Sequence, residues 1–286
     1  MPDLQPHEKR IEILFKYLDQ KSITALPPRG TLANKLNELA TYKGNPDIKI
    51  VYIAPRDTAL FITCAVEMWL RSVHSFLISV SLLESSPIWA SVCGYYSSHY
   101  CVRGFAHLLG FFQLHKARRV VSIEIVSGAY SCTFIKKNGG TREHQVYWKI
   151  IKQYEPFKSD PFFTLNDDNL KASDGAHRIV ANYYDHIGSF PRFRVLDENA
   201  LERIIETISK TELTDVPIPR GEKYPDIKYV QLIAYHRIVK FRNYLNEILG
   251  SSSAFWNLYK NPAWCPAAMN YQVVKPRFIS MYANYL

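Results

Sequence analysis

Residues 58–83 read TALFITCAVEMWLRSVHSFLISVSLL, an apolar stretch whose spacing predicts one long helix. Ser85, Ser86 and Pro87 interrupt the pattern, and Pro is favoured at the first position of a new helix. The next stretch, IWASVCGYYSSHYCVRGFAHLLGFFQL over residues 88–114, predicts a second long helix rich in aromatic and small residues. Two long helices in succession predict a mostly α protein.

The second of these helices contains two glycines, Gly94 and Gly104. Glycine weakens a helix locally, but it also allows a neighbouring helix to approach closely. Neither helix is expected to cross a membrane, because Ala59–Leu70, the most apolar segment, is short and contains Glu67.

The periodicity changes between residues 119 and 151, where apolar and polar residues alternate in three runs. Alternation with a period of two predicts β-strands. Asn138-Gly139-Gly140, between the second and third runs, is a strong hairpin-turn signal. We therefore predict a β-hairpin insertion of two or three strands at about 119–151. The alternating residues are Val121, Ile123 and Ile125, then Cys132 and Phe134, then Val146, Trp148 and Ile150.

Residues 226–249 give the clearest helical pattern, followed by Gly250 as a stop. Its apolar positions are Ile227, Val230, Ala234, Ile238, Phe241, Leu245 and Ile248. Other helices are predicted over 8–20, 31–40, 174–187 and 198–210, with a strand over 48–54. We interpret residues 1–55 as an N-terminal accessory region and 56–286 as the main helical domain, with the tail 251–286 covering its core.

The composition and the charge favour a folded chain that binds a polyanion. Of the 286 residues, 47% are apolar and 21% are charged, which excludes a disordered protein. The net charge is +9, which favours RNA or another polyanion as a partner. The five cysteines contain no CxxC pair, and the N-terminus has no apolar signal core. We therefore expect reduced thiols in a cytoplasmic protein.

Common catalytic motifs are absent from the sequence. It contains no GxxxxGK[ST] or GxGxxG phosphate loop, no HExxH and no GxSxG. These absences count against nucleotide-dependent enzymes, zinc proteases and α/β-hydrolases. We predict no cofactor and no metal site.

One candidate site lies on the helix predicted at 88–114. Tyr96, Tyr100, Arg103 and His107 follow one another at steps of four, three and four, and His99 lies four residues before Arg103. They therefore share one helix face. A guanidinium beside imidazoles and phenols can bind a phosphate and transfer a proton near neutral pH. The alternative is that the same residues are satisfied core groups.

A second candidate lies on the helix at 226–249, where Arg242, Asn243 and Glu247 sit beside the apolar face. His236 and Lys240 extend a polar stripe along that helix. Arg242 and Asn243 have the chemistry to grip a phosphate. The alternative is a solvated helix face.

Two segments resemble HEPN-like domains, the higher eukaryotes and prokaryotes nucleotide-binding family. The first reads Tyr95-Tyr96-Ser97-Ser98-His99-Tyr100-Cys101-Val102-Arg103 and then Leu108-Leu109, after a long helix. The second, Phe241-Arg242-Asn243-Tyr244, resembles the last core helix of the family. The resemblance covers about 58–115 and 175–250, with the β-hairpin as an insertion.

The resemblance implies a helical bundle that forms homodimers. Active members are metal-independent ribonucleases of toxin–antitoxin and phage-defence systems, and their signature is Arg, a polar residue and a later His. Arg242-Asn243 begins that signature, but Glu247 stands near the place of the His. If the chain is catalytic, the resemblance assigns phosphate binding to Arg103 and Arg242, with Asn243 beside Arg242.

In that catalytic interpretation His107 carries the proton. His99, Tyr96, Tyr100 and Glu247 then complete the binding surface. The alternative is a non-catalytic module that binds a partner protein or a nucleotide through its tyrosine-lined groove.

Overall fold

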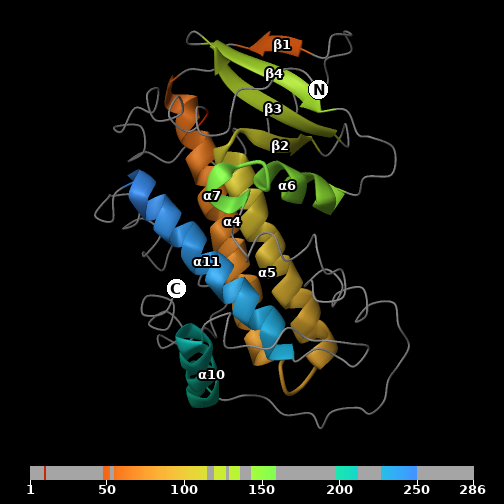
Figure 1. Ribbon diagram of the computed structural model, residues 1–286, viewed down its shortest axis with the longest axis vertical. Helices are drawn as coiled ribbons and strands as arrows, with labels where there is room; N and C mark the ends of the chain where they lie inside the picture. Colours follow the sequence, from red (N-terminus) through yellow and green to blue (C-terminus); the bar gives the residue numbers. More distant parts are fainter. Residues whose placement is uncertain are drawn as a thin grey trace. The chain divides into compact units, whose positions relative to one another are not determined.

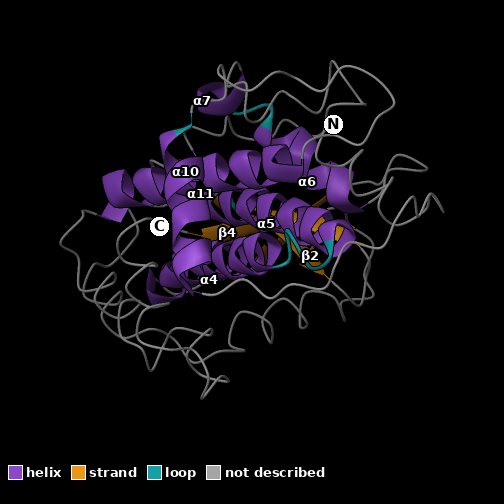
Figure 2. Ribbon diagram, turned by 90° about the horizontal axis from the view of Figure 1, so that it is seen from below, coloured by secondary structure: helices purple, strands orange, loops and turns teal. Residues whose placement is uncertain are grey.

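The computed structural model describes residue 10 and residues 48–51, 55–114, 119–126, 129–135, 143–158, 198–211 and 227–249. Most of these residues are helical, as Figure 2 shows in purple, so the predicted mostly α character is confirmed. The helices predicted over 31–40 and 174–187 lie outside the described residues, as does the tail 251–286 and all of 8–20 except residue 10.

The chain divides into two compact units. The first consists of Met1–Glu67 with Val102–Lys158, and the second consists of Met68–Cys101 with Ser159–Leu286. Two long helices, α4 (Pro55–Ser81) and α5 (Pro87–Leu108), contribute residues to both units. The domain boundary predicted at residue 55 stays a prediction.

Helix α5 ends earlier than predicted, because Gly110 turns the chain. Gly110 has a φ of 83°, in the left-handed region that favours glycine. Its N–H donates to the carbonyl of His107 at 3.0 Å, which closes the helix end. Residues Phe111–Leu114, expected to be helical, instead form strand β2.

The first unit contains an antiparallel four-stranded sheet with the order β1-β4-β3-β2 (Figure 1). Strand β1 spans Ile48–Val51, β3 spans Arg119–Val126 and β4 spans Ala129–Ile135. The register pairs Ile123 with Cys132, and it pairs Phe111 with Ser122. The two strands that pair with β3, β2 and β4, are thus close to it in sequence. Strand β1 comes from a distant segment and pairs with β4 at the edge of the sheet.

The segment 119–151, predicted as a β-hairpin insertion, contains two strands and then a helix. Strands β3 and β4 are separated by residues 127–128, whereas the turn predicted at 138–140 lies outside the described residues. The third predicted strand was wrong, because Glu143–Ile151 forms helix α6. Its fully buried residues Tyr147 and Ile151 are four apart, which is a helical spacing. The short helix α7 (Glu155–Lys158) follows, and its Phe157 ring packs 4.4 Å from Phe105.

Arg10 is a buried cation in the first unit, and 5% of its surface is exposed. Its guanidinium donates to the carbonyl of Leu109 at 3.0 Å and to the hydroxyl of Ser122 at 2.9 Å. The guanidinium carbon also lies 4.5 Å from the centre of the Phe111 ring. The carbonyls at a helix C-terminus lack partners within the helix, and a cation there is favourable. Arg10 therefore ties the end of α5 to strands β2 and β3.

In the second unit, α11 (Ile227–Leu249) packs on parts of α4 and α5 (Figure 1). The predicted helix is confirmed, and its predicted apolar residues Val230, Ala234, Ile238, Phe241 and Leu245 are buried. A Cβ atom at Gly94 of α5 would lie 2.7 Å from Cγ1 of Val230. The predicted close approach of a neighbouring helix at Gly94 is therefore confirmed.

Helix α10 (Glu198–Lys210) contacts α11, and it was also predicted. It buries Leu201, Ile205 and Ile208, which are spaced four and three residues apart. The carbonyl of Thr211, directly after α10, lies 2.8 Å from Nε2 of His236. This polar contact fastens the end of α10 to α11.

Candidate functional site

Arg103 and His107 form part of a cluster in the first unit. Arg103 is half-buried, and its guanidinium carbon lies 5.8 Å from the centre of the Tyr147 ring. His107 is 5% exposed and stacks on Phe112, with ring centres 4.7 Å apart and 20° between the planes. It meets Tyr147 edge-on at 6.4 Å. One fully buried tyrosine therefore contacts both predicted site residues.

Cys64 of α4 is also close to Arg103. Burial raises the pKa of the Cys64 thiol to about 12, and the carboxylate of Glu67 adds to this increase. The positive charge of Arg103 acts in the opposite direction. The thiol therefore stays protonated near neutral pH, and it is not a thiolate nucleophile.

The predicted aromatic face of α5 lies in the second unit. His99 is 3% exposed, and its ring is parallel to that of Tyr95 within 6°, with 6.2 Å between centres. Tyr96 and Tyr100 are half-buried, and their ring centres are 6.2 Å apart. His99 lies 6.5 Å from Tyr96 and 6.1 Å from Tyr100. The four rings form a continuous aromatic cluster.

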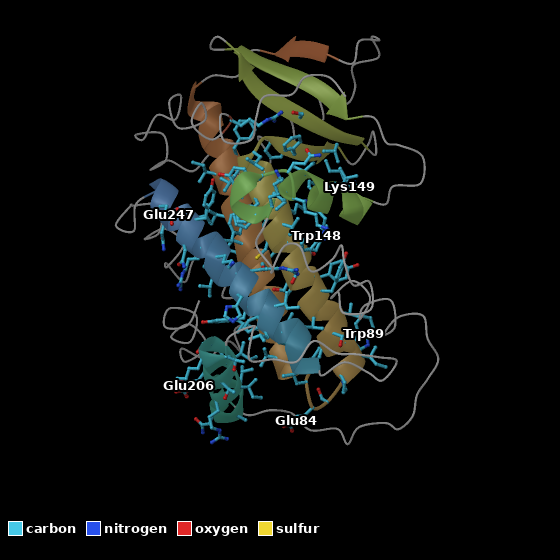
Figure 3. All side chains as sticks on the ribbon, viewed as in Figure 1. Glu84, Trp89, Trp148, Lys149, Glu206 and Glu247 are labelled. Carbon is cyan, nitrogen blue, oxygen red and sulfur yellow. The ribbon has the colours of Figure 1, made fainter. Side chains whose placement is uncertain are left out.

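The predicted polar stripe of α11 is the most accessible of the candidates. Arg242 is half-buried, whereas Asn243 and Glu247 are exposed. The guanidinium of Arg242 donates a long hydrogen bond of 3.4 Å to the side-chain oxygen of Asn243. Figure 3 shows Glu247 near the C-terminal end of α11. His236 and Lys240, earlier in the stripe, are half-buried.

The candidates therefore fall into separate groups. Arg103 and His107 belong to the first unit, and the other predicted residues belong to the second. Burial of His107 and His99 among rings favours the core interpretation for both imidazoles. A general acid or base must come within hydrogen-bond reach of its substrate, and a buried imidazole lacks that access. Arg242 and Asn243 keep access to solvent.

Two buried residues of importance were not singled out from the sequence. Arg237 of α11 is fully buried, and its charge acts on the Cys101 thiol. A sequence signal for it existed, because Arg237 lies three residues after Ala234 and four before Phe241, on the apolar face. Tyr147 gave no such signal, because its segment was interpreted as a strand.

The structure supports no metal centre in the part of the chain that it describes, since no three His, Cys, Asp or Glu residues there form a group that could hold a metal ion. None of the described helices is long and apolar enough to cross a membrane. Comparisons with protein-family models, curated proteins and solved structures found no match.

Proposed function

We propose that this chain binds RNA through the polar face of α11, with Arg242 and Asn243 contacting the phosphate backbone. The observation that supports this most directly is the accessible Arg242–Asn243 pair. A guanidinium offers several N–H donors in one plane, which suits phosphate oxygens. The net charge of +9 favours encounter with a polyanion.

The proposal also assigns the chain to the HEPN-like family. Two features support that assignment: the two long helices α4 and α5, and the Phe241-Arg242-Asn243-Tyr244 segment of α11. That assignment makes a cytoplasmic toxin or phage-defence protein the expected setting and a homodimer the expected assembly. It would also make partner-protein binding an alternative to RNA binding.

Binding without cleavage is favoured over ribonuclease activity. The proposed proton carrier His107 is 5% exposed and packs against Phe112 and Tyr147. Metal-independent cleavage stays the second candidate, because Arg103 and His107 are one helical turn apart and both contact Tyr147. Incubation of purified protein with mixed tRNA in EDTA separates the two. We expect intact RNA at every protein concentration.

The binding proposal is tested by fluorescence anisotropy with labelled single-stranded RNA over a series of salt concentrations. We expect affinity to fall steeply as salt rises, because phosphate contacts release counterions. Arg242→Ala should weaken binding and reduce the salt slope by about one. Arg71→Ala is the matched control, because Arg71 is an exposed arginine of α4 in the same unit.

Two results would overturn the proposal. The first is affinity that does not change with salt, which would exclude phosphate contacts as its source. The second is an equal effect of Arg242→Ala and Arg71→Ala, which would leave no special role for the Arg242–Asn243 pair. In the second case the net charge alone would account for binding.

A further inference from the structure

Two exposed polar side chains follow Arg242 along the last turns of α11. Asn243 and Glu247 are four residues apart, so they share one face of the helix. Within the described ranges, the side chain of Glu247 forms no hydrogen bond or ion pair, and the side chain of Asn243 bonds only to Arg242. Both side chains therefore keep hydrogen-bonding groups that are open to a ligand.

The contact with Arg242 decides which group Asn243 presents to a ligand. Oδ1 of Asn243 accepts the hydrogen bond of 3.4 Å from the guanidinium, so the amide nitrogen is the group left over. Nε of Arg242 is shielded from solvent, so a ligand meets the outer nitrogens of the guanidinium. The Arg242–Asn243 pair thus offers N–H donors, and such donors suit phosphate oxygens.

Glu247 has the opposite chemistry. Its carboxylate only accepts hydrogen bonds, and it repels a phosphate. Four residues of helix span about 6 Å along the axis, so a strand whose phosphate lies on the Arg242–Asn243 pair brings a neighbouring sugar to Glu247. A sugar group that binds a carboxylate has to donate a hydrogen bond. The 2′-hydroxyl of ribose can donate one, and DNA lacks this group.

We propose that Glu247 accepts a hydrogen bond from a ribose 2′-hydroxyl, so that the polar face of α11 distinguishes RNA from DNA. This inference rests on the proposed function and specifies its substrate class as ribose-containing strands. Phosphate contacts by Arg242 and Asn243 cannot make the distinction, because both nucleic acids carry the same phosphates. With DNA, Glu247 has no hydroxyl to accept from, and only its repulsion of the phosphates remains.

The charges along this part of α11 agree with a strand bound across it. Lys240 lies three residues before Asn243 on the same polar stripe, and Arg242 lies beside Asn243. The two cations outnumber the single anion Glu247 between residues 240 and 247, so the face still attracts phosphate. One carboxylate among these groups lowers the affinity for any nucleic acid that does not supply a donor to it.

The experiment is an anisotropy titration with three labelled single strands of about twelve nucleotides and one base sequence. The strands are RNA, DNA with deoxyuridine in place of thymidine, and RNA with every 2′-hydroxyl methylated. Wild type should bind RNA about tenfold more tightly than either of the others, which is the effect of one hydrogen bond to a charged group. The methylated strand keeps the ribose oxygen and lacks the donor, so it should bind as weakly as DNA.

Glu247→Ala should reduce the ratio of RNA to DNA affinity to about one. Loss of the repulsion raises both affinities equally, whereas loss of the hydrogen bond lowers the affinity for RNA alone. Glu84→Ala is the matched control, because it removes another exposed carboxylate of the second unit, at the far end of the helices from Glu247 (Figure 3). It should leave the ratio at about ten. Thermal unfolding of each variant reports whether the fold is intact.

Several outcomes would overturn this inference. If wild type binds RNA and DNA equally, with a steep salt slope that Arg242→Ala reduces, Glu247 has no part in selection and the proposed function stands. A Glu247→Ala protein that keeps the preference for RNA leads to the same conclusion. Equal losses of RNA and DNA affinity in Glu247→Ala would mean that Glu247 meets a base and not the sugar. If wild type binds neither strand, the proposed function and the inference both fall.

Discussion

The hydroxyls of Ser72 and Ser97 each donate a hydrogen bond to the main-chain carbonyl of the other residue, at 2.7 and 2.8 Å. The pairing connects α4 to α5 inside the second unit, where both residues are fully buried. Seven residues later on α4, Ser79 donates to the carbonyl of Ala90 at 2.6 Å, and Ala90 precedes Ser97 by seven residues. Small hydroxylated side chains thus let two antiparallel helices approach closely while their buried oxygens stay satisfied.

Ser72→Ala and Ser97→Ala should each lower the free energy of unfolding by at least about 1 kcal/mol, because each removes a hydroxyl that donates to the carbonyl of the other residue. The Ser72 hydroxyl also lies 2.9 Å from the Cys101 sulfur, so Ser72→Ala should cost more than Ser97→Ala. The double variant should lose less than the sum, since the two hydroxyls are also 3.1 Å from each other and act as a unit. Urea denaturation measures all three.

The matched control for this pair is Ser81→Ala. The Ser81 hydroxyl bonds to Ile78 within its own turn of helix and is partly exposed, so its removal should change stability by less than about 0.5 kcal/mol. Additive losses in the double variant would contradict the reciprocal pairing.

Gly94→Ala tests the contact between α5 and α11. The added Cβ would lie 2.7 Å from Cγ1 of Val230 and 3.1 Å from the hydroxyl of Ser79. Valine is stiff about its first side-chain torsion, so it moves away from the methyl group only at a cost. We expect a net loss of about 1–3 kcal/mol in a urea titration, despite the better helix propensity of alanine.

Val230→Ala supplies the control for Gly94→Ala, because it removes the methyl group that the new Cβ meets. The double variant Gly94→Ala/Val230→Ala should be more stable than the sum of the two single effects predicts. A Gly94→Ala protein as stable as wild type would mean that the helices separate without cost at this point.

Long helices with a clear apolar face could be predicted from the sequence. The pattern in α11 gave both its bounds and its buried residues, since every turn repeats the same signal. The pattern over Val146, Trp148 and Ile150 predicted the wrong element, because a short run with Lys149 as its one polar residue fits both a strand and a helix period. Tyr147 and Ile151, fully buried and four apart, show which period the tertiary contacts select.

The candidate site was less predictable than the fold. Spacing placed Tyr96, His99, Tyr100, Arg103 and His107 on α5 correctly, but helical spacing gives no information on burial. Arg10 shows the limit of prediction from local spacing, because its hydrogen-bond partners Leu109 and Ser122 are about a hundred residues away in sequence. Long-range contacts of that kind depend on the complete fold.

Cys101 should make stability decline at alkaline pH. Burial raises the pKa of its thiol to about 12, against an ordinary value of 9.0. Between these values the unfolded state loses the proton while the folded state keeps it, so stability falls as pH rises from about 9 to about 12. Urea denaturation over this range should show a smaller decline for Cys101→Ala than for wild type.

The accompanying readout for Cys101 is alkylation by iodoacetamide at about pH 8, mapped by mass spectrometry. Only a thiolate reacts, so native Cys101 should stay unmodified and become modified in denaturant. Half-buried Cys93 is the internal control and should react before Cys101. Rapid native modification of Cys101 would contradict its burial.

Two substitutions at His107 test most directly whether this residue is part of the core or carries a proton. His107→Ala removes a ring that packs 4.7 Å from Phe112, and the cavity should cost about 2–4 kcal/mol in a denaturant titration. His107→Phe keeps an aromatic ring in the same place and removes the titratable nitrogens. If His107 is a core residue, His107→Phe should approach wild-type stability and bind RNA like wild type. A His107→Phe protein that is stable but has lost an RNA-cleaving activity present in wild type would instead identify the imidazole as the proton carrier, and the ribonuclease interpretation would replace the binding proposal.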